Sequence, residues 1–260
     1  MPQRVTLALA LGALLAPLPL AAADLAAVRT RGVLRAIVSA DEAPETFDVK
    51  GGERAGFERE LIETFARMQG LKVEVVSAKS LADRIPMLQA GRGDFIVAIF
   101  DTPERRQQIA FTAEIMPTYN VAVTLLPKPA PRTLEELRRE KVGAVRGAAP
   151  GDDAVAAGVS SVQRFESLKE MVAALASGAI GAMVIPISEF VLAAKREPTL
   201  RSGVVVGATG SIAWGVRKED AALRAALDTH LSNVRKSASW NLLLVKYFGE
   251  QAPLVLGRRR

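Results

Sequence analysis

One helix–turn–strand unit occurs twice in this sequence. SLADRIPMLQAGRGDFIVAI (80–99) aligns without a gap with SLKEMVAALASGAIGAMVIP (167–186). In each copy apolar residues recur at helical spacing, a glycine (Gly91 or Gly178) ends the helix, and an apolar strand follows. A repeated unit of this kind constrains the chain to two related halves, each of which buries its own apolar strand in a sheet.

Predicted strands also precede each copy of the repeat. They lie at 32–38 and 72–76 in the first half, and at 141–147 and 161–165 in the second. Strands that alternate with helices in this way indicate parallel sheets. We therefore expect an α/β fold in which each half forms one lobe with its own parallel sheet.

Two extended stretches, 119–126 and 204–216, connect the halves. After the second stretch, 219–235 and 239–248 have the apolar periodicity of amphipathic helices. If these helices return to the first lobe, that lobe is discontinuous and the connection is a hinge of two strands. The expected organisation is a first lobe of residues 24–118 plus 209–260 and a second lobe of residues 119–208.

The N-terminus has the layout of a secretory signal peptide. An apolar run at 5–20 follows the basic Arg4 and precedes the small residues 21–23. The alternative is a membrane anchor, but the run is short for a membrane span and two prolines interrupt it. We expect residues 1–23 to be removed before Asp24, which would leave a soluble protein in the periplasm.

Composition excludes several classes of site. The chain has no cysteine and one histidine, His230, so thiol nucleophiles, cysteine-ligated metals and histidine clusters are excluded. Its 34 basic residues are interleaved with 28 acidic ones, and no nucleic-acid-binding motif accompanies them. Sequence signatures of nucleotide-binding, serine-nucleophile and zinc-protease sites are also absent. We expect no metal, cofactor or nucleic acid partner.

The loops at the carboxyl ends of the predicted strands are where a ligand would bind in such a sheet. One of these loops contains Thr102 and Pro103, which resemble a helix N-cap and first helical residue. Arg105 then falls in the first helical turn, where its guanidinium could grip a carboxylate with two parallel hydrogen bonds. The alternative is a surface arginine paired with Glu104 or Glu114.

Four segments together resemble a known family. These are GFERELIETFARMQGLKVEVV (56–76), LQAGRGDFIVAIFDTPERRQQIAFT (88–112), VGAVRGAAPGDDA (142–154), and the stretch from SIAWGVRKEDAALRAAL to SWNLLLVKYFG (211–249). In their order along the chain they look like the bacterial extracellular solute-binding proteins of family 3, the periplasmic receptors of polar amino acid ABC transporters. The resemblance implies the type II periplasmic binding protein fold, a monomer, a small ligand enclosed between the lobes, and a permease as partner.

The resemblance also implies a set of ligand-binding residues. The family's T-x-x-R segment, whose arginine binds the ligand's α-carboxylate, is matched by Thr102 and Arg105. The preceding strand end would contribute Phe100 and Asp101, and the loop after residue 145 would contribute backbone N–H groups. The remaining positions are Arg146, Ala148, Ala149, Glu42, Phe47, Pro186, Ser188 and Glu189.

One position departs from the family in a way that bears on the ligand. Pro186 stands where amino acid receptors have the aspartate that holds the α-ammonium. Either Glu189, Glu42 or Asp101 takes over this task, or the ligand has no ammonium, because an unpaired buried ammonium is costly. With Arg146 as a second positive group, the sequence favours an anion and predicts poor binding of ordinary amino acids.

The leading hypothesis is thus a solute-binding protein without enzymatic activity. One alternative is a sensor or partner domain, because similar domains are fused to lytic transglycosylases and histidine kinases. Another is an enzyme that resembles cyclohexadienyl dehydratase, with Glu189 or Glu42 as the acid and Arg105 holding the substrate carboxylate.

Overall fold

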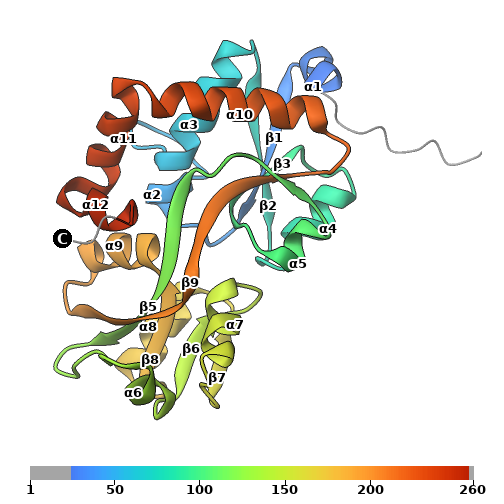
Figure 1. The fold of residues 1–260 in the computed structure, drawn as a ribbon. Helices are drawn as coiled ribbons and strands as arrows, with labels where there is room; N and C mark the ends of the chain where they lie inside the picture. Colours follow the sequence, from blue (N-terminus) through green and yellow to red (C-terminus); the bar gives the residue numbers. More distant parts are fainter. Residues whose placement is uncertain (1–24, 258–260) are drawn as a thin grey trace, which may run out of the picture.

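The computed structural model describes residues 25–257 of the chain. The predicted signal peptide, residues 1–23, lies outside the described residues. The fold is mixed α/β, with two lobes joined by a pair of long strands (Figure 1). No helix in the described range is long and apolar enough to cross a membrane.

The first lobe is built around three parallel-paired strands with helices between them. Strand β1 (Val33–Ser39) pairs in parallel with β2 (Lys72–Ala78) and β3 (Phe95–Phe100). The other elements of this part of the chain are α1 (Leu25–Arg31), α2 (Pro44–Phe47), α3 (Phe57–Met68), α4 (Arg84–Gln89), α5 (Pro103–Arg106) and β4 (Ala110–Phe111).

The second lobe repeats this plan with shorter elements. Strand β6 (Val142–Val145) pairs in parallel with β7 (Val162–Phe165) and β8 (Ala182–Pro186). The helices of this lobe are α6 (Leu134–Arg138), α7 (Ala149–Ala156), α8 (Leu168–Ala176) and α9 (Ile187–Arg196). The parallel strands and the helices between them therefore follow the pattern expected from the sequence.

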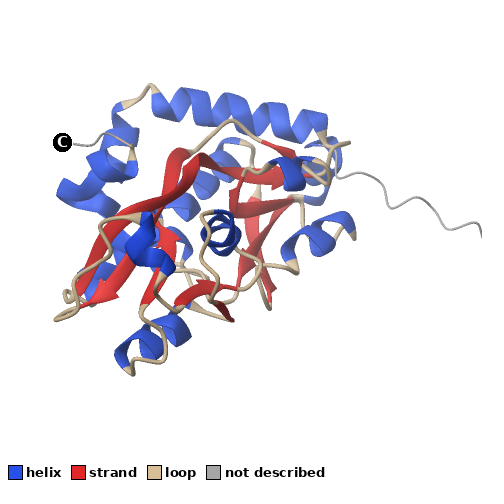
Figure 2. Cartoon of the chain, turned by 60° about the horizontal axis from the view of Figure 1, so that its bottom comes forward, coloured by secondary structure: helices blue, strands red, loops and turns tan. Residues whose placement is uncertain are grey.

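The two crossing strands pair with each other and with both lobes. Strand β5 (Met116–Leu125) runs antiparallel to β9 (Leu200–Val216), and the two lie side by side between the lobes in Figure 1. Strand β9 also pairs with β3, and β5 pairs with β8. Hydrogen bonding therefore continues from one lobe to the other, so the expectation of two separate sheets is wrong. The strands run through the whole molecule, with helices packed around them (Figure 2).

The two copies of the repeat occupy equivalent places. Each has a helix, a glycine in the left-handed region (φ 69° at Gly91 and 75° at Gly178), and a strand that pairs with a crossing strand. Their starts are stabilised differently, since the Glu170 N–H donates to the Ser167 hydroxyl, whereas the Ser80 N–H and hydroxyl donate to the Asp83 carboxylate. The repeat therefore places both strand ends, and the loops that follow them, around the space between the lobes.

The chain ends on helices that return to the first lobe. These are α10 (Ala221–Arg235), α11 (Ala238–Phe248), a short 3₁₀ helix (Gly249–Gln251) and α12 (Ala252–Val255). The ring of Phe57 on α3 lies 5.4 Å from the rings of both Trp240 and Phe248, in edge-on contacts that join α3 to α11. Helix α12 then packs against α9 of the second lobe.

Candidate functional site

A pocket lies between the lobes, where the strand ends converge. It encloses about 810 Å³, including its open mouth. Most of its wall is apolar, with Phe57, Phe100, Met116, Ile185 and Phe248 among the lining residues. The polar wall consists of two arginines, three glutamates, Thr46 and Ser188. A concave, mostly apolar space with a few convergent charges is the usual form of a small-ligand site.

Arg105 connects the two lobes at this pocket. Its helix begins as expected, because the Arg105 N–H donates to the Thr102 hydroxyl at 3.4 Å. The guanidinium donates from Nη1 to the Phe100 carbonyl and from Nη2 to the Gly147 carbonyl in the other lobe, each at 3.0 Å. Burial, and secondly the charge of Arg84, lower the pKa of Arg105 to about 10, so the group stays cationic at neutral pH. No ion pair of Arg105 occurs within residues 25–257.

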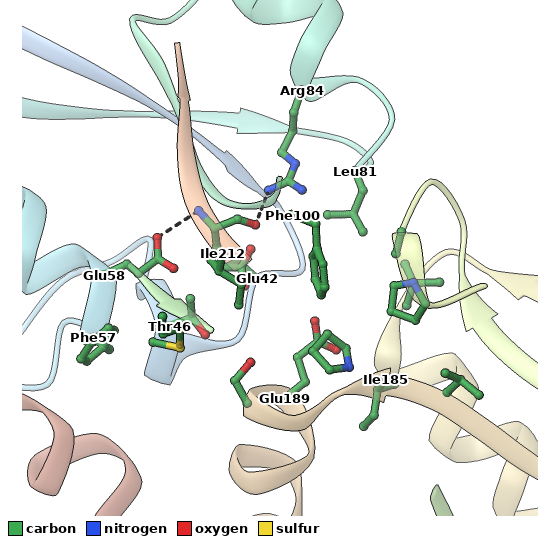
Figure 3. Close-up of a pocket in the computed structure, with 18 of the residues that line it drawn as sticks. Glu42, Thr46, Phe57, Glu58, Leu81, Arg84, Phe100, Ile185, Glu189 and Ile212 are labelled. Atoms are coloured by element: carbon green, nitrogen blue, oxygen red, sulfur yellow. Dashed lines mark hydrogen bonds between the residues drawn. The ribbon is translucent and has the colours of Figure 1, made fainter. Parts of the chain in front are cut away.

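A buried network occupies the first-lobe wall of the pocket (Figure 3). The Glu58 Oε2 accepts hydrogen bonds from the Ala98 N–H at 2.9 Å and from the Trp214 Nε1–H at 2.8 Å. The Ala98 carbonyl accepts from Nη1 of Arg84 at 3.3 Å, and the Val97 carbonyl accepts from the same nitrogen at 2.8 Å. Ala98 has φ 49°, so a strained residue in β3 directs its N–H and carbonyl to Glu58 and Arg84.

Burial raises the pKa of Glu58 to about 8, although the Trp214 N–H opposes the shift. Burial also lowers the pKa of Arg84, which three carboxyl groups oppose: Glu42, Glu58 and Glu189. Arg84 keeps its Nε without a hydrogen-bond partner in the described part of the chain. Arg84 and the carboxyl groups of Glu42, Glu58 and Glu189 therefore interact electrostatically inside the pocket wall.

Glu42 and Glu189 bring carboxyl groups from opposite lobes to the pocket. Glu42 follows β1, whereas Glu189 lies in the first turn of α9 and points toward the space below Phe100 in Figure 3. Burial and, secondly, the negative charge of Glu42 raise the pKa of Glu189 to about 8, although the charge of Arg84 opposes the shift. Burial likewise raises the pKa of Glu42. A cation that binds beside these carboxyl groups would favour their ionised forms.

The structure brings seven of the expected residues to the pocket wall. Arg105, Phe100, Glu42, Pro186, Ser188 and Glu189 line it, as does Ala148 from the loop after β6. Pro186 ends β8 and directly precedes α9, so the first turn of this helix faces the pocket beside it.

The other expected residues lie elsewhere. Asp101 has a mostly buried side chain that pairs with the exposed Arg106 of α5, and Arg146 pairs with Glu166, with its own side chain 57% exposed. Phe47 is buried under the guanidinium of Arg59. The remaining two, Thr102 and Ala149, form the starts of α5 and α7 and do not line the pocket.

Sequence reasoning missed Glu58 and Arg84. Each stands on the apolar face of its helix, Glu58 three residues before Leu61 and Arg84 four residues before Leu88. The sequence signal for both was a charged residue at the helical spacing of buried apolar residues. A charged group on the buried face of a helix needs an internal partner or a ligand.

The part of the chain described by the structure contains no cluster of three side chains that could hold a metal ion.

Two solved structures are similar to this chain over most of its length. A mutant of ArgBP from T. maritima is 25% identical and has a TM-score of 0.78, with 87% of this chain and 99% of that chain covered. An ancestral amino acid-binding protein, a precursor of cyclohexadienyl dehydratase, is 25% identical with a TM-score of 0.76 and covers 86% of this chain and 99% of its own.

A membrane-bound lytic murein transglycosylase F from Stutzerimonas stutzeri (strain A1501) is 23% identical over 235 residues. The match covers 87% of this chain but only 48% of the transglycosylase, so the chain spans about half the length of this relative. A family model, "Bacterial extracellular solute-binding proteins, family 3", matches residues 34–250. Since this match extends over most of the sequence and the fold agrees with it, the chain belongs to the bacterial extracellular solute-binding proteins of family 3.

Proposed function

We propose that this chain is a receptor for a small ligand of the amino acid type, which carries both a carboxylate and an amine. The observation that carries the proposal is the presence of both charges in one pocket between the lobes. The Arg105 guanidinium is available for a carboxylate, and Glu42 and Glu189 offer carboxyl groups for an amine. A ligand that bridges these groups would hold the two lobes together.

The two kinds of charge are separated within the pocket. Arg84 shifts the pKa of Arg105 and also that of Glu189, whereas Asp152 and Glu104 are the acids that act on Arg105. We infer that Arg105 and Glu189 face different ends of the space, with Arg84 between them. Such an arrangement suits a zwitterion, because each end of the ligand meets the opposite charge.

The case for an anionic ligand is weaker in the structure than in the sequence. It depended on Pro186 leaving the amine without a partner and on Arg146 adding positive charge. Arg146 instead pairs with Glu166 outside the pocket, and Glu189 stands one helical turn from Pro186 with its carboxyl group in the pocket wall. A second ligand carboxylate would lie against Glu42 and Glu189, which is unfavourable for like charges.

The family suggests how the bound ligand would be used. We infer that the mature protein works in the periplasm, after removal of residues 1–23, and presents its closed form to an ABC transporter permease. The solved structures it resembles bear the names of binding proteins, which supports a receptor rather than an enzyme. Permease and ATPase genes beside its own would support this role.

A second candidate is a ligand-sensing domain that works with a separate cell-wall enzyme. The match to about half of a lytic transglycosylase favours it, because a domain of this family occurs there as part of a longer chain. Under this proposal the pocket has the same ligand chemistry and the partner differs. A gene neighbourhood with cell-wall hydrolases and without permease genes would favour it over transport.

A thermal-shift screen of free amino acids, short peptides and dicarboxylates tests the proposed function. A ligand present at a hundred times its Kd should stabilise the fold by about 2.7 kcal/mol and raise the Tm. We expect ligands with both an amine and a carboxylate to give the largest shifts. Larger shifts with dicarboxylates that lack an amine would contradict the proposal.

Replacement of Arg105 tests the carboxylate end. Arg105→Ala should weaken the best ligand by about a hundredfold in calorimetry, because a charge-assisted contact in a closed site is lost. Arg106→Ala is the matched control, since the exposed side chain of this neighbour pairs with Asp101. Equal affinities of the two variants would remove Arg105 from the site.

A further inference from the structure

A second pocket adjoins the first. It encloses about 680 Å³ including its mouth, and it shares Glu42, Leu81, Val145 and Glu189 with the first pocket. These four side chains therefore border both pockets. The two glutamates bring carboxyl groups from opposite lobes to this shared border.

A buried hydroxyl in the second pocket has no partner. Ser39 ends β1, lines the second pocket and is 6% exposed. Its Oγ makes no hydrogen bond with any residue in 25–257. Leaving such a buried hydroxyl unsatisfied is unfavourable, so a polar ligand atom in this pocket would supply the missing hydrogen bond.

The second pocket also has an excess of unpaired acid. Its Glu166 and Arg196 are neutralised by Arg146 and Glu45. Asp41, Glu42 and Glu189 form no ion pair in the described part of the chain, whereas Lys79 is the corresponding unpaired base. A cationic group in this pocket would meet these three carboxyl groups, although Glu189 must first release the proton that burial makes it retain.

The second pocket offers the first a continuation. The two pockets share four lining residues, so a ligand held in the first can extend toward the second. Each further peptide unit extends a chain by at most about 3.3–3.6 Å. Further residues on a ligand anchored at Arg105 would therefore extend it from the first pocket toward the second.

We propose that the two pockets form one extended site for a short peptide. Its C-terminal carboxylate binds Arg105, and its chain passes between Glu42 and Glu189. Its N-terminal ammonium lies in the second pocket, facing Asp41, where the peptide also satisfies Ser39. This inference rests on the proposed function and specifies the ligand class of the same site.

Calorimetry with leucine, alanyl-leucine and alanyl-alanyl-leucine tests the length of the ligand. Leucine is chosen as the C-terminal residue because Phe57, Phe100 and Met116 line the first pocket. We expect at least one peptide to bind tenfold or more tightly than leucine, and N-acetylation of that peptide to remove the gain. Leucine binding as tightly as both peptides would overturn the inference while leaving the proposed function intact. If none of these compounds, nor any other free amino acid, binds at millimolar concentration, both proposals fail.

Two substitutions test the place where the extra residues bind. Ala193→Phe narrows the second pocket without touching the first and should weaken the peptide about tenfold, with leucine unaffected. Ala173→Phe, at an exposed position of α8 that lines neither pocket, is the control. Ser39→Ala should weaken the peptide severalfold and should not weaken leucine. Unchanged peptide affinity in both Ala193→Phe and Ser39→Ala would place the peptide elsewhere and overturn the inference.

Discussion

At the scale of single residues, the site depends on acids whose protons are held by burial. Glu58 accepts from two N–H groups in the wall, and Glu189 faces Glu42 across the pocket. Both have a pKa near 8. Neither property is visible in the sequence, because it arises when distant segments exclude water from one space.

Glu58 should make folding stability depend on pH. Its carboxyl group has a pKa of about 8 when folded and about 4.5 when unfolded, so the folded state retains a proton that the unfolded state loses between these values. Stability should therefore fall as pH rises through this window. Glu58→Gln should reduce the fall, and at about pH 6 it should cost less than about 1 kcal/mol, since an amide resembles the protonated acid.

Denaturant titrations at several pH values measure this effect. Glu63→Gln, a more exposed position of the same helix, controls for the loss of a negative charge. Glu58→Ala should cost about 1–3 kcal/mol at about pH 5, because it leaves the Ala98 and Trp214 N–H groups unsatisfied. This cost should shrink as pH rises, since only the wild type loses the stability linked to the Glu58 proton. A Glu58→Gln variant with the same pH slope as the wild type would mean that Glu58 is ionised in the folded protein.

At the scale of secondary structure, most elements could be predicted from the sequence. The repeat, the strands that precede it, the crossing strands and the last two long helices all occur, with ends displaced by a few residues. Local signals determine these features: apolar periodicity, the Thr102 cap and the left-handed glycines. The irregularity in β3 at Ala98 could not be predicted, because alanine has no preference for the left-handed region.

Ala98 should be a strained point in its strand. Its φ of 49° costs about 1 kcal/mol or more for a residue with a Cβ. Ala98→Gly should therefore raise the free energy of unfolding by about 0.5–1 kcal/mol, and Ala98→Val should lower it by about 1–3 kcal/mol because of its branched side chain. Thermal unfolding of the two variants measures whether each is more or less stable than the wild type. Destabilisation by glycine together with tolerance of valine would show that Ala98 is not held at this φ.

At the scale of the whole molecule, contacts between the lobes hold the pocket closed. Besides Arg105 and Gly147, Arg196 on α9 pairs with Glu45 on α2, and Lys195 donates to the Tyr247 carbonyl at 2.6 Å. The two-lobe organisation could be predicted from the repeat. These contacts could not, since they join side chains from segments about 150 residues apart, such as Glu45 and Arg196. We propose lobe boundaries at 118/119 and 208/209.

Removal of the Glu45–Arg196 pair should loosen closure only slightly. Both side chains are partly exposed, so the pair is worth at most about 1 kcal/mol. Glu45→Gln should weaken ligand binding by no more than about fivefold. Glu135→Gln, which breaks an exposed pair within α6, is the control and should leave affinity unchanged. Calorimetry would contradict this account of closure if Glu45→Gln strengthened binding.

The central claim is that the lobes enclose a ligand of the amino acid type, and that the amine of a free amino acid pairs with Glu189. The most direct test is calorimetric titration of the best free amino acid from the thermal-shift screen, at about pH 6 and about pH 8. Because the pKa of Glu189 is about 8 in the empty pocket, a cationic group must displace its proton at the lower pH. We predict that affinity rises more than tenfold between the two pH values and that Glu189→Gln abolishes the rise. Affinity that falls with pH, as binding of an anion beside this acid requires, would contradict the account.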